Sequence, residues 1–209
     1  MEVLNNDETL SQEPTNTDAL SNNKWFFLRL LISILLLTFS GIFSTYIYYH
    51  LEGKGGVYFP GLLYTSTTIL IFLLTKKNLT LKKLSIYYSL MMVTYLLVWL
   101  LTMLSSWFAF LAGILTAGIG AIASFALVDR FIINLNYKKV EVFAIGSLAF
   151  LLTDILYWTF NILADKTPFA YLLKVDVSAN LLFLEVFIFW HILVGTRLFL
   201  TLEKAHDHG

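Results

Sequence analysis

Residues 107–128 read WFAFLAGILTAGIGAIASFALV, twenty-two consecutive residues without a charged side chain. A helix of about 20 apolar residues spans the hydrocarbon core of a bilayer, which is about 30 Å thick. An open sheet cannot satisfy its backbone in lipid, and the alternating pattern of a transmembrane β-barrel is missing. The segment therefore predicts a transmembrane helix.

Five further segments have the same character, within a chain of 209 residues that is 58% hydrophobic and only 13% charged. An ordinary soluble domain carries about 25% charged residues. The six predicted spans are about 25–49, 57–75, 84–104, 107–128, 140–163 and 179–202. The predicted fold class is all-α: a polytopic membrane helix bundle of six transmembrane helices over residues 24–203.

The basic residues predict the orientation of this bundle, because cytoplasmic loops collect Lys and Arg. Eleven of the fourteen basic residues fall on one side of the predicted spans: Lys24, Arg29, Lys76, Lys77, Lys82, Lys83, Arg130, Lys138, Lys139, Arg197 and Lys204. We therefore expect both termini in the cytoplasm, residues 204–209 forming a short cytoplasmic tail. The expected location is a plasma membrane or a bacterial inner membrane.

Residues 1–23 contain five acidic side chains, no basic one and no aromatic one. Such a segment cannot bury enough apolar surface to fold alone, so we expect a disordered, acidic cytoplasmic tail. A secretory signal begins with a positive region before a short apolar stretch. The acidic tail argues against one, and we expect the first span to be retained.

The span 140–163 carries the carboxylate of Asp154 in apolar surroundings. At 3.6 residues per turn, one side of this helix also holds polar or amphipathic side chains: Ser147, Tyr157, Trp158 and Asn161. A carboxylate near the bilayer centre costs about 2.5–3.5 kcal/mol on insertion scales, so it is by default a functional candidate. The alternative is a protonated Asp154 that bonds a neighbouring helix and serves structure alone.

The last span carries Glu185 and His191. Counting about 1.5 Å per residue from the span midpoints puts Asp154 between these two in depth. A neutral His191 beside Asp154 would make a proton relay, because imidazole titrates near working pH. Asn180 shares a helical face with His191, and this face is predicted to line a cavity open to the outer side. The alternatives are a packed His191 that makes one hydrogen bond and a Glu185 paired with a polar group near the surface.

Small residues recur every three or four positions in 107–128: Gly113, Ala117, Gly120, Ala121 and Ser124. Such spacing lets helix backbones approach closely in lipid. The face predicts either packing inside the bundle or contact with a second copy or another membrane-complex subunit.

Several chemistries are excluded or unsupported. The chain has no cysteine, so disulfides and thiolate metal sites are excluded. Recognisable nucleotide-binding, serine-hydrolase and zinc-protease motifs are missing. His206 and His208 are too few to define a metal site, so we expect no metal and no cofactor. The zero net charge gives no reason to expect nucleic acid.

Three functions remain for a protein of this class. The first is a small transporter or ligand-binding membrane protein with an outward-facing polar site and possible proton coupling. Its candidate site comprises Asp154, His191, Glu185, Trp158, Tyr157, Asn161 and Asn180. The second is a non-catalytic subunit of a larger membrane complex. The third is an intramembrane enzyme, which no motif supports.

Overall fold

A computed structural model of the chain describes residues 16–51, 56–75, 79–104, 109–166 and 180–206. Side chains are described for residues 24–48, 50–51, 56–75, 79–101, 111–156, 159 and 187–205. Six α-helices follow in chain order: α1 (Asn16–His50), α2 (Tyr58–Thr75), α3 (Leu81–Leu104), α4 (Ala109–Phe131), α5 (Lys139–Lys166) and α6 (Asn180–His206). The described residues contain no strand, which confirms the all-α helix bundle.

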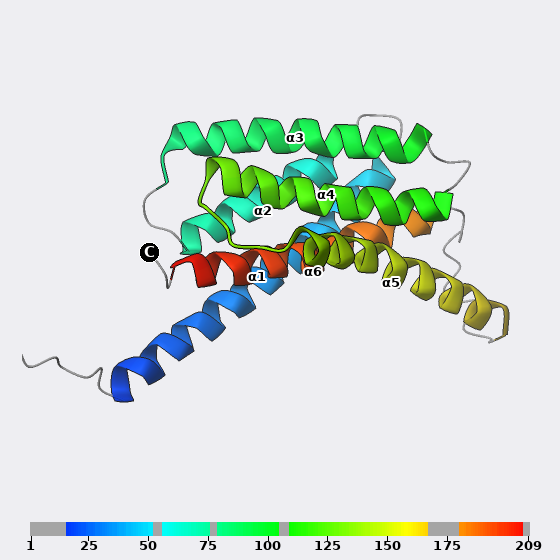
Figure 1. Ribbon diagram of the computed structural model, residues 1–209. Helices are drawn as coiled ribbons and strands as arrows, with labels where there is room; N and C mark the ends of the chain where they lie inside the picture. The colour runs from blue at the N-terminus through cyan, green and yellow to red at the C-terminus, as the bar shows by residue number, and fades with distance from the viewer. Residues whose placement is uncertain (1–15, 52–55, 76–78, 105–108, 167–179, 207–209) are drawn as a thin grey trace, which may run out of the picture.

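Several helices are longer than the apolar runs that predicted them. α1 begins at Asn16, inside the tail expected to be disordered, and Figure 1 shows its N-terminal part extending beyond the other helices. α6 continues to His206, past the predicted end at 202. A helix need not stop where its apolar run stops, because polar residues such as Lys and Glu also favour helix. Hydropathy therefore fixes the membrane-compatible part and not the helix ends.

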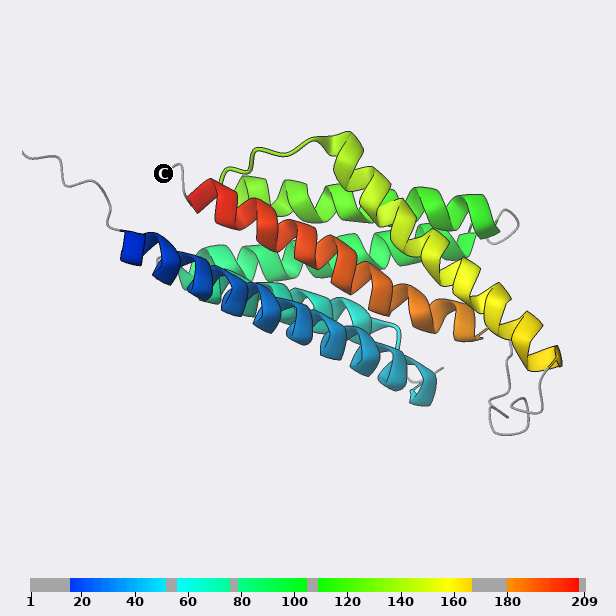
Figure 2. The ribbon, with the colours of Figure 1, turned by 90° about the horizontal axis from the view of Figure 1, so that it is seen from below.

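The helices form a closed ring in chain order. Each helix packs against the next one in sequence, and α6 returns to pack along α1. α6 also contacts α2 and α4 across the ring. Figure 2 shows α6 lying between α1 and α5, with α5 leaning away from the bundle toward its C-terminal end. Among the described residues, α6 therefore contacts four of the other five helices, all but α3.

Among the described residues, four helices are long and apolar enough to cross a membrane: Lys24–Tyr48, Tyr58–Thr75, Leu81–Leu101 and Leu111–Phe131. Their outward faces carry large apolar side chains; in α3 this includes Val93 at 53% and Leu97 at 56% exposure. Lipid suits such faces better than water does. The helices thus indicate a membrane protein, while the count of six spans and the side of each terminus stay predictions.

Glycines set the closest helix contacts. A Cβ on Gly41 of α1 would lie 2.7 Å from the Cα of Ile188 in α6. A Cβ on Gly146 of α5 would lie 2.5 Å from the carbonyl oxygen of Ala117 in α4. Both contacts are with backbone atoms that cannot turn aside. Glycine is thus required where α1 meets α6 and where α4 meets α5.

Several buried threonine and serine hydroxyls donate to carbonyls of their own helices. Thr65 donates to the carbonyl of Gly61, and Ser124 donates to that of Gly120, each one turn back. An unpaired hydroxyl in an apolar region costs free energy, and the carbonyl one turn back is the nearest acceptor. Ser147 of α5 instead donates to the carbonyl of Ile114 in α4, at 3.0 Å. Ser147, one of the polar residues noted in the span 140–163, thereby ties two helices together.

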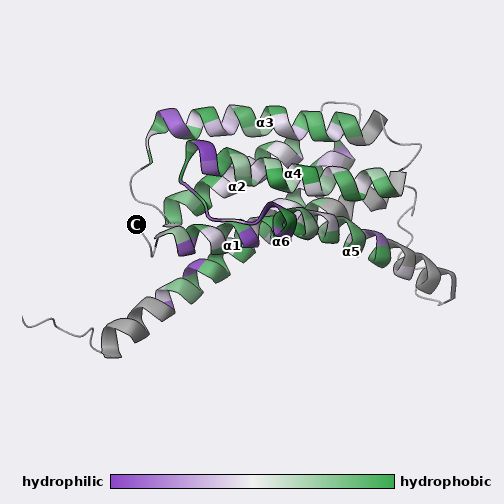
Figure 3. Cartoon of the chain, viewed as in Figure 1, coloured by the Kyte–Doolittle hydropathy of each residue, from purple (hydrophilic) through white to green (hydrophobic). Residues whose placement is uncertain are grey.

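One end of the bundle carries the ion pairs. Arg29 Nη2 of α1 lies 2.8 Å from Glu203 Oε2 of α6, and Arg197 Nη2 of α6 lies 2.7 Å from Glu141 Oε2 of α5. Figure 3 shows hydrophilic residues gathered at this end, which we call the charged end. Parts of α1 and α6, near the start of α1 and the end of α6, both lie at this end.

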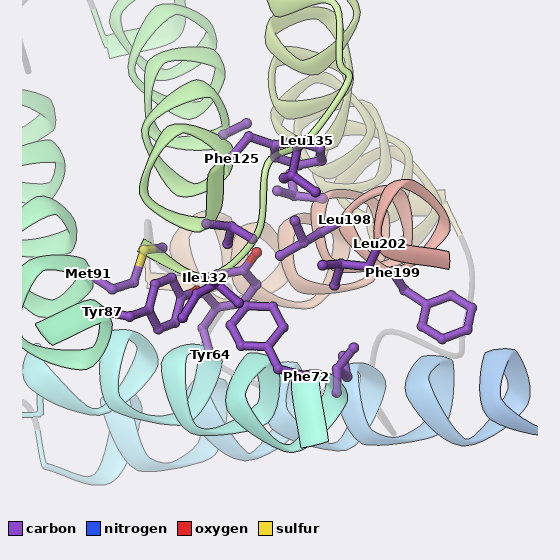
Figure 4. Packing of buried hydrophobic residues seen from close by; sticks show 14 of the residues in the cluster. Tyr64, Phe72, Tyr87, Met91, Phe125, Ile132, Leu135, Leu198, Phe199 and Leu202 are labelled. Carbon is purple, nitrogen blue, oxygen red and sulfur yellow. The ribbon is translucent and has the colours of Figure 1, made fainter. Parts of the chain in front are cut away.

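A dense apolar core lies next to the charged end. It joins side chains from all six helices and from the 132–138 connection, where Asp129 Oδ1 accepts a hydrogen bond from the amide of Leu135 at 2.6 Å. Figure 4 shows part of this core: Tyr64, Phe72, Tyr87, Met91, Phe125, Ile132, Leu135, Leu198, Phe199 and Leu202. Ile132 and Leu135 belong to it although they lie outside any helix. The connection thus closes this end with apolar side chains.

Candidate functional site

A cavity of about 120 Å³ lies between α2, α3, α4, α5 and α6. It occupies the half of the bundle away from the charged end, because its wall includes Gly61 and Gly113, which lie near the beginnings of α2 and α4. The described residues of the wall are Gly61, Tyr64, Thr65, Met91, Thr94, Tyr95, Val98, Trp99, Gly113, Thr116, Ala117, Gly120, Phe150, Phe187, Trp190 and His191. This cavity is the candidate functional site.

The residues of the wall follow helical stripes. In α3 they are Met91, Thr94, Tyr95, Val98 and Trp99, which are spaced three and four positions apart as one face of a helix requires. The α4 stripe consists of small residues and one threonine. Large aromatic groups on α3 therefore face a thin side of α4, and the difference in side-chain size leaves space between the two helices.

Aromatic rings make up much of the wall. The ring centroids of Tyr64 and Trp190 lie 4.7 Å apart in an edge-to-face arrangement, and the Tyr64 ring lies 4.9 Å from that of His191. Trp190 Nε1 donates to the carbonyl of Ala117 at 3.2 Å, which ties α6 to α4. Edge-to-face pairs are favourable because the positive ring edge meets the negative face. The contacts hold this side of the wall in one arrangement.

His191 is the titratable residue of the wall that the sequence predicted as functional. Its side chain is only 2% exposed, and its Nδ1 lies 3.3 Å from the hydroxyl oxygen of Ser40 in α1. Among the described residues, Ser40 is its hydrogen-bond partner. His191 is therefore a cavity residue held by one hydrogen bond.

Three polar atoms of wall residues have no hydrogen-bond partner among the described residues: the hydroxyl oxygens of Tyr64 and Tyr95 and Nε1 of Trp99. All three atoms are buried. A buried polar group without a partner costs about 1–3 kcal/mol, and such groups are uncommon in native proteins. The three residues line the cavity, but these polar atoms have almost no accessible surface in it.

Asp154 lies on α5 one turn beyond Phe150 of the wall, with a partly exposed side chain. No hydrogen bond or ion pair joins its carboxylate to His191 or to any other described residue. The other predicted residues lie in helices whose side chains are outside the described part of the structure at these positions: Tyr157, Trp158, Asn161, Asn180 and Glu185. Their roles stay predictions, and so does a functional role for Asp154.

The small-residue face of α4 is occupied inside the bundle. A Cβ on Gly146 of α5 would lie 2.7 Å from the Cβ of Ala121, and Gly113 faces the ring of Phe150. Gly120 faces Val98 and Trp190 across the cavity. The packing that the sequence offered as one alternative is present, and a second copy or subunit at this face stays a prediction. The described residues contain no group of three or more His, Cys, Asp or Glu side chains suited to a metal ion.

Comparison with protein-family models, with curated proteins and with solved structures finds no match to this chain. The function of the chain is therefore inferred from the residues that line the cavity. Sequence reasoning missed Tyr64, Tyr95 and Trp99. A signal for the last two was present, because Thr94, Tyr95 and Trp99 form an amphipathic stripe on an otherwise aliphatic helix.

Proposed function

We propose that this chain is an integral membrane protein that binds a small molecule in the aromatic cavity and transfers it within or across the bilayer. The observation that carries the proposal is the cavity itself, which lies among five helices and is lined by aromatic and small side chains, three threonines and His191. Ligand pockets are mostly apolar and carry a few convergent polar groups. The wall described above has this composition.

The uneven packing along the bundle supports a transport role. At the charged end, ion pairs join α1 to α6 and α5 to α6 above a dense core, whereas the cavity lies in the opposite half. Many transporters expose a site near the midplane to one side at a time. With the predicted orientation, this arrangement corresponds to a site closed toward the cytoplasm. Breaking the ion pairs would be one way to open that end.

The contacts of His191 favour ligand binding over a proton relay. A relay needs a second group that exchanges protons near neutral pH, such as a carboxylate. The described polar partner of His191 is the hydroxyl of Ser40, which does not titrate in this range. We therefore assign His191 the role of a hydrogen-bonding group of the site.

The test fills the cavity. A Cβ on Gly120 would lie 3.5 Å from Val98 Cγ1 and 3.6 Å from Trp190 Cζ2, so a larger side chain can enter there. We expect Gly120→Leu to fold and to weaken ligand binding about tenfold or more by occupying the cavity. Ile119→Ala is the matched control, because Ile119 lies on the same helix and is 48% exposed on its outer face.

The probes are four single-ring compounds of similar size: isopropylbenzene, acetophenone, benzylammonium and benzoate. Binding to the purified chain in lipid nanodiscs is measured by equilibrium dialysis, with partition into empty nanodiscs subtracted. At least one compound should bind to the wild type and to Ile119→Ala, and lose affinity in Gly120→Leu. If no compound binds, or if Gly120→Leu binds as well as the wild type, the proposed function is wrong. Uptake of a binding compound into proteoliposomes then separates transport from binding alone.

A further inference from the structure

We infer that the cavity takes an uncharged, apolar molecule about the size of one substituted ring, the class of small arenes and other cyclic hydrocarbons. This inference rests on the proposed function and adds the chemistry of the ligand. It follows from three properties of the wall: the partners of its polar atoms, its lack of partners for water or charge, and the volume that it encloses.

Several polar groups of the wall are bonded within the protein. The hydroxyls of Thr65 and Thr116 donate to carbonyls one turn back in their own helices, each at 2.7 Å. Trp190 Nε1 donates to the carbonyl of Ala117 in α4 at 3.2 Å. The protons of these three groups are therefore used inside the helix bundle and do not serve a ligand.

Other polar atoms of the wall lie out of reach of a ligand. The hydroxyl oxygens of Tyr64 and Tyr95 and Nε1 of Trp99 each have less than 1 Å² of accessible surface. His191 is only 2% exposed, and its Nδ1 lies 3.3 Å from the hydroxyl oxygen of Ser40. Apolar atoms accordingly form nearly all of the accessible surface of the cavity. A ligand in this space meets carbon and not hydrogen-bonding groups.

Water and charged molecules are poor ligands for such a surface. A buried water molecule makes about three hydrogen bonds to polar groups, whereas a cavity lined by apolar side chains stays dry. None of the described wall residues is Asp, Glu, Lys or Arg, so an ion would lose its hydration without gaining an opposite charge. Aromatic faces can attract a cation, which is the alternative that the test includes. An apolar molecule gains free energy when it leaves water for this surface.

The volume of the cavity sets the size of the ligand. The cavity measures about 120 Å³. An engineered apolar cavity of about 150 Å³ holds benzene, so the present one accommodates a single ring with small substituents. The rings of Tyr64 and Trp190 meet edge to face with centroids 4.7 Å apart and form one corner of the wall. A flat ring extends this set of contacts, because aromatic pairs favour offset and edge-to-face arrangements.

The test compares isopropylbenzene with acetophenone, which has nearly the same shape but a carbonyl oxygen in place of one methyl group. In the nanodisc dialysis assay, with affinities referred to the free concentration in water, isopropylbenzene should bind about tenfold or more tightly. The reason is that the carbonyl loses its hydrogen bonds to water without replacement. Benzylammonium and benzoate should bind more weakly than isopropylbenzene. Binding should saturate at one molecule per chain, which partition into lipid does not.

A larger hydrocarbon tests the size of the site. 1,3,5-Triisopropylbenzene has the chemistry of isopropylbenzene but carries two more substituents on the ring. We expect it to partition into the nanodisc lipid without saturable binding to the chain, because overfilling a packed cavity is unfavourable. Saturable binding of this compound as tight as that of isopropylbenzene would overturn the inferred size.

Variants of α3 test the apolar surface. The side chain of Val98 faces the cavity, since its two methyl groups lie 3.5 and 3.7 Å from the position of a Cβ on Gly120. Val98→Thr keeps the shape and places a hydroxyl in the wall, so it should weaken isopropylbenzene about two- to tenfold. Val93→Thr is the matched control, because Val93 lies on the same helix and is 53% exposed on its outer face. Tyr95→Phe removes a polar atom that the ligand does not reach, and both affinities should stay within about twofold of the wild type.

The outcomes separate the two proposals. The apolar class is wrong if acetophenone binds more tightly than isopropylbenzene, if Tyr95→Phe weakens acetophenone beyond this range, or if Val98→Thr and Val93→Thr have equal effects. If benzylammonium or benzoate binds most tightly and Gly120→Leu abolishes it, the proposed function stands and the ligand class is overturned. If none of the four compounds shows saturable binding, as when lipid chains fill the cavity, both proposals fail.

Discussion

Two glycine-to-alanine substitutions test the helix packing around the cavity. In Gly120→Ala, the new Cβ would lie 3.5 Å from Val98 Cγ1, an ordinary van der Waals distance. In Gly146→Ala, it would lie 2.5 Å from the carbonyl oxygen of Ala117, closer than real Cβ atoms come. Both glycines lie inside helices, so the gain in helix propensity, about 1 kcal/mol in water, is common to both and cancels in their comparison.

The magnitude follows from the space at each site. A methyl group takes up about as much volume as a water molecule, about 30 Å³, and filling a cavity recovers about 24 cal/mol per Å³. Gly120→Ala should therefore gain about 0.7 kcal/mol from packing. Gly146→Ala must separate α4 from α5, and overpacking of this kind costs about 1–3 kcal/mol. The two variants should differ by about 2–4 kcal/mol in free energy of unfolding.

The assay is reversible unfolding in mixed detergent micelles, followed by circular dichroism, with both variants measured beside the wild type. Gly120→Ala should equal or exceed the wild type in stability, and Gly146→Ala should fall below it. Equal stability of the two variants would refute the close approach of α4 and α5. A loss in Gly120→Ala as large as that in Gly146→Ala would refute the cavity.

Three further predictions concern charged and titratable groups. Glu203→Gln should lower the free energy of unfolding by about 1–3 kcal/mol in the same assay, because the Arg29 guanidinium, whose side chain is only 30% exposed, loses its charged partner. No measurable change would contradict a role for this pair in closing the charged end. Asp154→Asn should leave isopropylbenzene affinity within about twofold, whereas a loss beyond tenfold, about 1.4 kcal/mol, would return Asp154 to the binding site. Burial and the nearby Asp129 raise the pKa of Tyr137 above its usual value, so the folded state favours the neutral phenol. That contribution to stability is complete below about pH 10 and is lost as the pH rises through the folded-state pKa. Between about pH 9 and pH 11, the free energy of unfolding should therefore fall less in Tyr137→Phe than in the wild type. An equal fall in both proteins would contradict the prediction.

Hydropathy predicted the helices well because one physical requirement governs them. The second span was predicted at 57–75, and α2 runs from Tyr58 to Thr75. Backbone groups in lipid must bond within their own helix, so an apolar run of sufficient length has one available structure. The ends are less well determined, as α1 shows by beginning at Asn16, since polar residues continue a helix into water.

The arrangement of the helices could not be predicted in the same way. Hydropathy gives the depth of a residue along a span but not the neighbour that its side of the helix meets. Asp154 and His191 were placed at similar depths, and α5 does pack against α6, yet the hydrogen bond of His191 goes to Ser40 of α1. The predicted partner was Asp154 of α5, whereas closure of the ring brings the first helix, with Ser40, to the last.

Most of the cavity wall escaped prediction because its residues cost little in a membrane. A lone carboxylate such as Asp154 is singled out in the sequence because its insertion into the membrane costs free energy. An aromatic ring or a hydroxyl group inserts at small cost when its polar atom has a partner. The Thr65 hydroxyl donates a hydrogen bond to the carbonyl of Gly61, and Trp190 Nε1 donates one to the carbonyl of Ala117. Such residues suit a site for a neutral ligand, because the described wall holds no Asp, Glu, Lys or Arg that would draw in water. In a bundle of this composition, a stripe of aromatic and hydroxyl residues facing a stripe of small ones is therefore the stronger sequence signal for a binding site.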